Sequence, residues 1–149
     1  MPDDVLVLED ATILYRNFSG TAGPYNREGE RSFSVIIDDA ATAERLANDG
    51  WNIKVRDPRE EGDDPILYLD ISVNYKYRPP TIFMITSKGR QLLVEDLVGT
   101  LDWADITNVD LSVRPYAWDV NGKQGIKAYL ASLYVKVEED YLAAKYSDV

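Results

Sequence analysis

Residues 110–137 read DLSVRPYAWDVNGKQGIKAYLASLYVKV and carry the clearest structural signal in the chain. Two runs rich in β-branched and aromatic residues flank Asn121-Gly122. Asn-Gly is the strongest short-range hairpin signal, because both central residues of a type I′ turn need positive φ. The segment is therefore predicted to form an antiparallel hairpin whose loop is this dipeptide.

The predicted loop also fixes which residues lie opposite each other. The expected pairs are Val120 with Lys123, Trp118 with Gly125, Tyr116 with Lys127, and Arg114 with Tyr129. Because side chains alternate across a strand, the last three pairs share one face, which carries rings and positive charges. The other face carries Leu111, Val113, Ile126, Ala128 and Leu130, which suit a core. Rings that stack on bases and cations that follow phosphates are typical of surfaces that bind single-stranded nucleic acid.

The same face also has a purely structural interpretation. Tyr and Trp favour strands, and aromatic–basic pairs across two strands can simply stabilise a sheet. Beyond Tyr129 the same parity carries the apolar residues Ala131, Leu133, Val135 and Val137. The strand is therefore expected either to pass from exposed to buried or to contain a bulge near Tyr129.

Length and composition limit the possible classes of protein. A chain of 149 residues is expected to form one domain with a substantial core. It has no apolar run long enough to span a bilayer and no leader of signal-peptide type, so no membrane association is expected. It has no cysteine and no histidine, which excludes disulfides and removes the commonest metal ligand and general base. No cofactor is expected.

The formal net charge of −10 is unfavourable for a nucleic-acid-binding protein, because phosphate contacts need Lys and Arg. The positive charges are nevertheless concentrated. They fall in residues 16–31, 54–59, 76–90 and 114–127, and the acidic clusters lie mainly between these segments. This distribution predicts a basic groove on an otherwise acidic protein.

Residues 17–31 contain three glycines and a proline, which predicts a long loop. Loops of this length are uncommon and usually functional or mobile. In and beside it are Arg16, Phe18, Tyr25, Arg27 and Arg31. The segment is either an arm that wraps a nucleic-acid strand or a connection with incidental charges.

The remaining pattern is rich in strands. Strands are predicted over residues 5–16 with a bend at Glu9-Asp10, and over 32–37, 51–57, 66–78 and 81–86, with a helix over 40–48 and a helical or irregular segment over 92–103. The long run 66–78 places Leu67, Leu69, Ile71 and Val73 on one face. This order favours a mainly β fold, specifically an OB-fold-like antiparallel Greek-key barrel with one or two short helices. The domain is assigned to residues 1–137, followed by an acidic C-terminal tail over 138–149.

Nothing in the sequence supports catalysis. Glu95-Asp96 and the carboxylates between Asp102 and Asp105 have no partner base, and Lys88-Gly89 lacks the spacing of a phosphate-binding loop. The protein is therefore not expected to be an enzyme. A metal nuclease built only from carboxylates is the catalytic alternative.

Several short motifs resemble those of small bacteriophage single-stranded DNA-binding proteins with an oligonucleotide-binding (OB) fold. The motifs are residues 16–20, 25–29, 31–33, 49–52, 85–89 and 113–116, together with Asn121-Gly122. The resemblance implies an accessory protein of phage DNA replication or recombination, acting in the cytoplasm of the infected host. It also implies an acidic tail that recruits other replication or recombination proteins, although this chain ends in Asp148-Val149 rather than in an aromatic residue.

Single-stranded DNA is thus the expected partner. The predicted nucleic-acid-binding residues are Arg16, Phe18, Tyr25, Arg27, Arg31, Lys76, Arg78, Lys88, Arg114, Tyr116, Trp118, Lys127 and Tyr129. The net charge keeps open a different class, a phage interaction or inhibitor protein whose acidic surface binds a host protein. A structural component of the virion is the third alternative.

Overall fold

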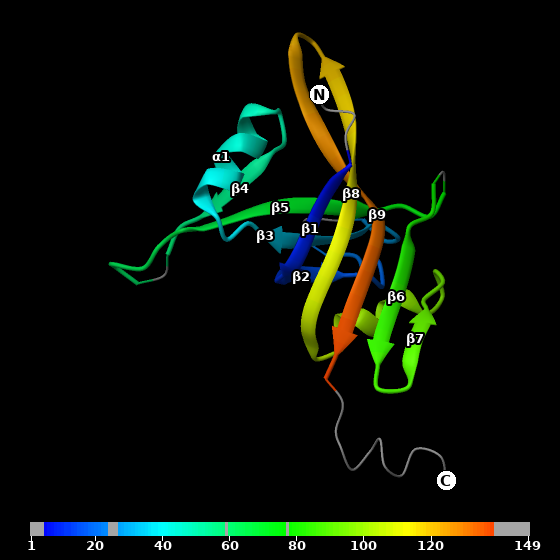
Figure 1. Cartoon of the computed structure of the whole chain (residues 1–149). Helices are drawn as coiled ribbons and strands as arrows, with labels where there is room; N and C mark the ends of the chain where they lie inside the picture. The colour runs from blue at the N-terminus through cyan, green and yellow to red at the C-terminus, as the bar shows by residue number, and fades with distance from the viewer. Residues whose placement is uncertain (1–4, 24–26, 59, 77, 139–149) are drawn as a thin grey trace.

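The computed structural model describes residues 5–23, 27–58, 60–76 and 78–138, and this part of the chain is mainly β. Its elements in order are β1 (Leu6–Ala11), β2 (Ile13–Asn17), β3 (Arg31–Ile36), α1 (Ala40–Asn48), β4 (Ile53–Arg56), β5 (Ile66–Val73), β6 (Thr81–Thr86), β7 (Gly89–Leu92), the 3-10 helix η1 (Val98–Asp102), β8 (Ile106–Val120) and β9 (Lys123–Val137). Figure 1 shows the long β8–β9 hairpin running through the whole molecule.

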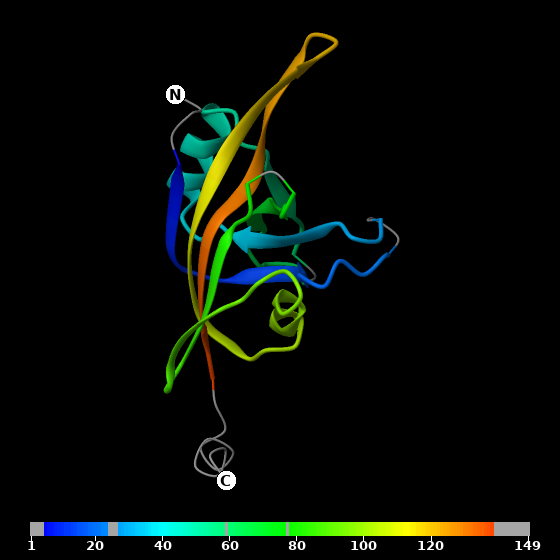
Figure 2. The same ribbon diagram turned by 90° about the vertical axis from the view of Figure 1, so that its right-hand side faces the viewer.

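The β8–β9 hairpin has the predicted register. Val120 pairs with Lys123, Trp118 with Gly125, Tyr116 with Lys127 and Arg114 with Tyr129. Asn121 and Gly122 both have positive φ, at 53° and 82°, as a type I′ turn requires. Figure 2 shows that the tip of this hairpin projects beyond the remaining strands.

A bulge interrupts the β8–β9 ladder beyond Tyr129, which was one of the two alternatives predicted for this strand. Ser112 pairs with Ser132, but Val113 pairs with Leu130, so Ala131 has no partner of its own. The extra residue reverses the parity of β9, so Leu130 and Leu133 both point into the core with exposures of 1% and 0%. The predicted core face is confirmed on both sides of the bulge.

The prediction of a mainly β fold is confirmed, but the sheet differs from the predicted antiparallel barrel in two respects. The sheet is mixed, because β9 runs parallel to β5 at Tyr129 and parallel to β6 over residues 81–85 of β6. The hydrogen-bonded order β1-β8-β9-β5-β3-β2 also does not close into a barrel, with β4 added on β5 and β7 on β6. β9 has 15 residues and β5 has 8, so β9 extends beyond β5. A second strand, β6, pairs with the C-terminal half of β9.

The two end strands of the sheet are consecutive in the chain. β1 pairs with β8 and β2 pairs with β3, and only Thr12 separates them. Asp10 adopts positive φ and the β1 register shifts at this point, which confirms the predicted bend. The backbone oxygen of Thr12 accepts a hydrogen bond from the Ile36 amide, so the bent segment is held against β3.

Helix α1 has the predicted start and stop. The Asp39 side chain accepts a hydrogen bond from the Ala41 amide, and Gly50 has the positive φ that a chain leaving a helix often needs. No helix among the described residues combines the length and apolar character needed to cross a membrane.

Two elements differ from the predicted boundaries. β5 ends at Val73 rather than at residue 78, because the Asn74 side chain accepts a hydrogen bond from the Lys76 amide and turns the chain. The predicted turn after Thr86 continues into the unpredicted strand β7, whose four residues are all exposed and carry no apolar periodicity.

The core contains the inner residues of the β8–β9 ladder. We expect Leu111→Ala to lower the free energy of unfolding by about 2–5 kcal/mol, because Leu111 is 2% exposed and the truncation leaves a cavity. Val120→Ala is the matched control at 58% exposure and should change stability by less than about 0.5 kcal/mol. Chemical denaturation of both variants measures the difference, and equal values would refute the assignment of this core face.

Candidate nucleic-acid interface

The outer face of the β8–β9 hairpin gathers rings and a cation. The rings of Tyr116 and Tyr129 meet edge to face, with centroids 6.0 Å apart, and the Lys127 ammonium lies 5.3 Å from the centre of the Tyr129 ring. Tyr116 is 60% exposed. Trp118 lies over Gly125, where a Cβ atom would come within 2.6 Å of the indole. The predicted face of rings and a cation is therefore present, and we call Tyr116, Trp118, Lys127 and Tyr129 the hairpin platform.

A small pocket beside this platform contains two arginines. Its volume is about 360 Å³, and it is lined by Asn74, Arg78, Arg114, Pro115, Tyr116, Tyr129 and Leu130. Arg114 donates a hydrogen bond to the backbone oxygen of Arg78 at 3.3 Å. Burial lowers the pKa of Arg114, and the nearby charge of Arg78 lowers it further. Two like charges in a partly enclosed pocket favour an anion between or beside them.

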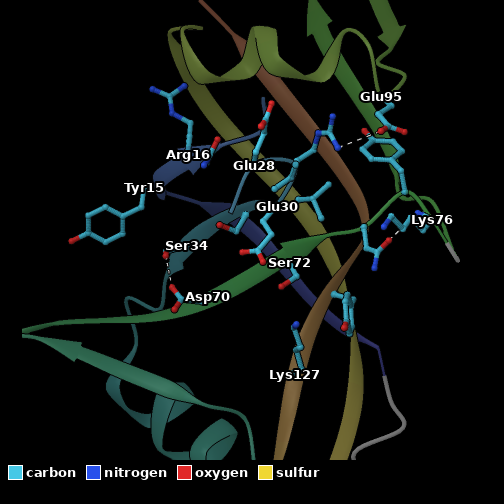
Figure 3. A pocket seen from close by; sticks show the side chains of 18 of the residues that line it. Tyr15, Arg16, Glu28, Glu30, Ser34, Asp70, Ser72, Lys76, Glu95 and Lys127 are labelled. Carbon is cyan, nitrogen blue, oxygen red and sulfur yellow. Dashed lines mark hydrogen bonds and ion pairs between the residues drawn. The ribbon is translucent and has the colours of Figure 1, made fainter. Parts of the chain in front are cut away.

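A larger groove of about 1310 Å³ adjoins the platform at Lys127 and Tyr129. It crosses β2, β3, β5 and β9, and Figure 3 shows Tyr15 and Lys76 on opposite sides with Ser34, Asp70 and Ser72 between them. Within the groove Asp70 accepts hydrogen bonds from Ser34 and Lys54, each at 2.5 Å. The bond to Asp70 raises the pKa of Lys54, so this cation is stabilised but also paired.

Aromatic rings line the groove at both sides. Tyr15 and Tyr68 meet edge to face with centroids 6.0 Å apart, and the Arg56 guanidinium lies 6.0 Å from the Tyr15 ring. On the other side the Arg31 guanidinium lies 5.6 Å from the ring of Tyr75. The groove thus repeats the combination of rings and cations found on the hairpin.

Four carboxylates also line the groove, namely Glu28, Glu30, Asp70 and Glu95. Asp70 is neutralised by Lys54, and Glu95 pairs with Arg31 at 3.3 Å. Lys76 and Lys127 form no ion pair with any described residue. These two lysines are therefore the groove cations most available to a phosphate.

Arg16 and Arg31 lie in the groove but hold the protein together. One nitrogen of Arg16 donates to the backbone oxygens of Leu101 and Ala104, both at 2.8 Å, and Arg31 donates to the oxygen of Phe18 at 2.9 Å. Much of their donor capacity is thus used within the protein.

The prediction that Phe18 binds nucleic acid was wrong. Its side chain is 0% exposed and stacks on Phe33 with centroids 5.1 Å apart, because this ring fills the core at the end of β2. The backbone around it is held by Asp102 of η1, which accepts hydrogen bonds from the amides of Phe18 and Ser19 and from the Ser19 hydroxyl. Asp102, which had no catalytic signal in the sequence, is therefore a structural clamp.

The remaining predicted residues are scattered. Arg27 is exposed in the loop whose ends meet through a hydrogen bond from Gly29 to Gly20. Tyr25 lies outside the described residues. Lys88 lies in the β6–β7 turn, at the opposite end of the molecule from the hairpin tip, so the structure does not bring it to the groove (Figure 1).

The sequence interpretation missed four groove residues, Tyr15, Lys54, Tyr68 and Tyr75. Tyr68 had a usable signal, since it shares the polar parity of Asp70 and Ser72 on the long strand. Tyr15 had none, because it reaches the groove from a backbone with φ of 52°.

The family model described as a putative phage ssDNA-binding domain matches residues 1–149. This protein belongs to that family. The match confirms the resemblance drawn from the short motifs. Comparison with curated proteins finds no match.

Solved structures show the same fold. The single-stranded DNA-binding protein from bacteriophage Enc34 has a TM-score of 0.59 at 11% identity, covering 91% of this chain and 82% of that one. The structure of that protein in complex with ssDNA has a TM-score of 0.61 at 12% identity, covering 91% and 88%. At this identity the likeness supports the fold, and the site must be argued from the residues of this chain.

The Asp102 clamp gives a prediction about stability. Asp102→Ala leaves the Phe18 amide without its acceptor, so we expect the free energy of unfolding to fall by about 1–3 kcal/mol. Asp105→Ala removes the same charge three residues later, at an exposed position, and should have little effect. Thermal denaturation compares the two, and a loss of stability common to both would point to charge rather than to the clamp.

Proposed function

We propose that this protein binds single-stranded DNA during phage DNA replication or recombination, without catalysing a reaction. The observation that carries the proposal is the outer hairpin face, where Tyr116, Tyr129 and Lys127 adjoin the pocket of Arg78 and Arg114. Family membership supports the same ligand. The protein acts in the cytoplasm of the infected host.

Bases stack on the exposed rings, and phosphates bind the cations between them. Tyr116 and Trp118 offer ring faces to successive bases at the hairpin, and the two-arginine pocket accepts a phosphate. The strand continues into the groove past Lys127 and Lys76. Stacking of this kind tolerates any base sequence, because every base has a π-face.

The net charge of −10 is compatible with this arrangement. Two groove carboxylates are paired within the protein, whereas the platform presents Lys127 and the two-arginine pocket. Phosphates therefore meet a locally positive path, and the acidic remainder of the surface disfavours contact elsewhere. Residues 1–137 form the binding domain, and the acidic residues of 138–149 recruit replication or recombination proteins.

The acidic surface also suits the second candidate, a protein that binds and inhibits a host protein. The two candidate functions differ in whether the protein binds single-stranded DNA and in how that binding depends on salt. Titration of a fluorescent oligothymidine at two salt concentrations separates them, because binding through phosphates weakens steeply as salt rises. An absence of binding at low salt would favour the inhibitor.

The hairpin platform predicts a loss of affinity on removal of one ring. Trp118→Ala should weaken binding by about 10- to 100-fold, since stacking contributes roughly 1–3 kcal/mol per base. Trp103→Ala removes an 89% exposed indole away from the hairpin and should leave the dissociation constant unchanged. Gly125→Ala should reproduce part of the Trp118 effect, because the added Cβ must displace the indole.

Binding constants and melting temperatures are measured for all three variants. If Trp118→Ala lowers the melting temperature sharply while the folded fraction binds normally, the ring is structural and the platform is wrongly assigned.

The two-arginine pocket predicts a change in salt dependence. Arg114→Gln should weaken binding at low salt and reduce the slope of log affinity against log salt by about 0.7, the value for one phosphate contact on a single strand. Arg45→Gln, an exposed arginine on α1, controls for the loss of one charge and should leave the slope unchanged. Equal slopes for both variants would remove Arg114 from the interface.

A further inference from the structure

The outer face of the β8–β9 ladder continues past the bulge to a second group of rings. Beyond the bulge the outward pairs are Ser112 with Ser132 and Asp110 with Tyr134. The neighbouring strand β6 places Phe83 beside Tyr134, and β7 places Leu92 beside Phe83. Figure 1 shows β6 beside this lower half of β9, with β7 beyond β6.

These residues have the same chemistry as the hairpin platform. The rings of Phe83 and Tyr134 are stacked, with centroids 5.6 Å apart and planes at 17°, and the Arg90 guanidinium lies 4.8 Å from the Phe83 ring. Leu92 is 50% exposed at the edge of the stack. We name this group the β6–β9 patch, made of Phe83, Arg90, Leu92, Tyr134 and Lys136.

The patch also carries unpaired positive charge. Arg90 and Lys136 are exposed, and neither forms an ion pair with a described residue. The nearby Asp110 carboxylate accepts a hydrogen bond from the Asp10 amide, so it is engaged by the backbone of β1. Exposed rings bordered by cations suit an anionic polymer that carries bases, because the rings stack on bases while the cations bind phosphates.

The bulge places this patch on the same face as the platform. Tyr129 and Tyr134 are five residues apart, an odd number, so in a regular strand their rings would lie on opposite faces of the sheet. The unpaired Ala131 reverses the parity, and both rings therefore point away from the core. The two rings are roughly 16 Å apart along β9, at about 3.3 Å per residue.

We propose that the β6–β9 patch is a second contact surface for the same DNA strand, which continues along the ladder from the hairpin platform. This inference rests on the proposed function and extends it by lengthening the bound segment. A strand long enough to pass the bulge contacts Arg90 and Lys136 through phosphates and Tyr134 or Phe83 through a base. A short strand occupies only the hairpin and the groove.

The test compares two lengths of oligothymidine, about 6 and about 18 nucleotides, since OB folds bind sites of about 4–16 nucleotides and only the longer strand exceeds that range. The double variant Arg90→Gln/Lys136→Gln should bind the long oligonucleotide about 10-fold more weakly, with a salt slope smaller by about 1.4, the value for two phosphate contacts. Its affinity and slope for the short oligonucleotide should match those of the unaltered protein. Arg45→Gln measures the effect of one lost charge remote from both surfaces.

A direct readout comes from a labelled cysteine. Because the chain has no cysteine, Leu92→Cys can carry an environment-sensitive dye at a single site. The dye should respond to the long oligonucleotide and not to the short one. A long-strand affinity equal to that of Arg45→Gln, or a dye that ignores the long strand, would overturn the proposal while leaving short-strand binding intact. Failure of both oligonucleotides to bind the unaltered protein at low salt would instead refute the proposed function.

Discussion

The register of the β8–β9 ladder is the constraint on which the rest of the structure depends. Asn121-Gly122 fixes the pairing at one end, and the unpaired Ala131 resets it by one residue. Side chains alternate along a strand, so a shift of one residue exchanges the two faces. The reset lets a 15-residue strand bury Leu130 and Leu133 while keeping the rings of Tyr129 and Tyr134 outside. One backbone irregularity therefore serves the core and the outer surface together.

The second constraint is electrostatic. An acidic chain that binds a polyanion must limit the repulsion between its carboxylates and the phosphates. Here ion pairs within the protein neutralise some of the groove carboxylates. Lys54 neutralises Asp70, and Arg31 neutralises Glu95. The other charged side chains that line the groove are the carboxylates Glu28 and Glu30 and the cations Arg16, Lys76 and Lys127. A pair shields its carboxylate without cancelling a neighbouring lysine, which explains how binding is compatible with the overall charge of −10.

The sequence predicted the features that depend on neighbouring residues and missed those that depend on distant ones. The hairpin register and its buried face followed from one dipeptide and from alternation, and the Asp39 cap followed from local chemistry. Phe18 was misjudged because its ring packs in the core against Phe33, and no local pattern shows that the two rings meet. The hydrogen bonds of Arg16 were not foreseen because its acceptors, the oxygens of Leu101 and Ala104, lie more than 80 positions away. The open, mixed sheet was missed for a similar reason, since parallel partners of β9 leave no mark on the sequence of β9 itself.

The hairpin tip shows how a structural and a binding role can share one side chain. Trp118 covers Gly125, and an aromatic ring over a strand glycine protects a backbone that has no side chain of its own. That packing uses one face of the indole, and the ring remains 39% exposed. Figure 2 shows that the tip projects beyond the remaining strands, so the exposed part of the ring can be reached by a base. The protein thereby fixes the position of the Trp118 ring before DNA binds. A base that stacks on it loses conformational freedom, but the side chain itself loses little more.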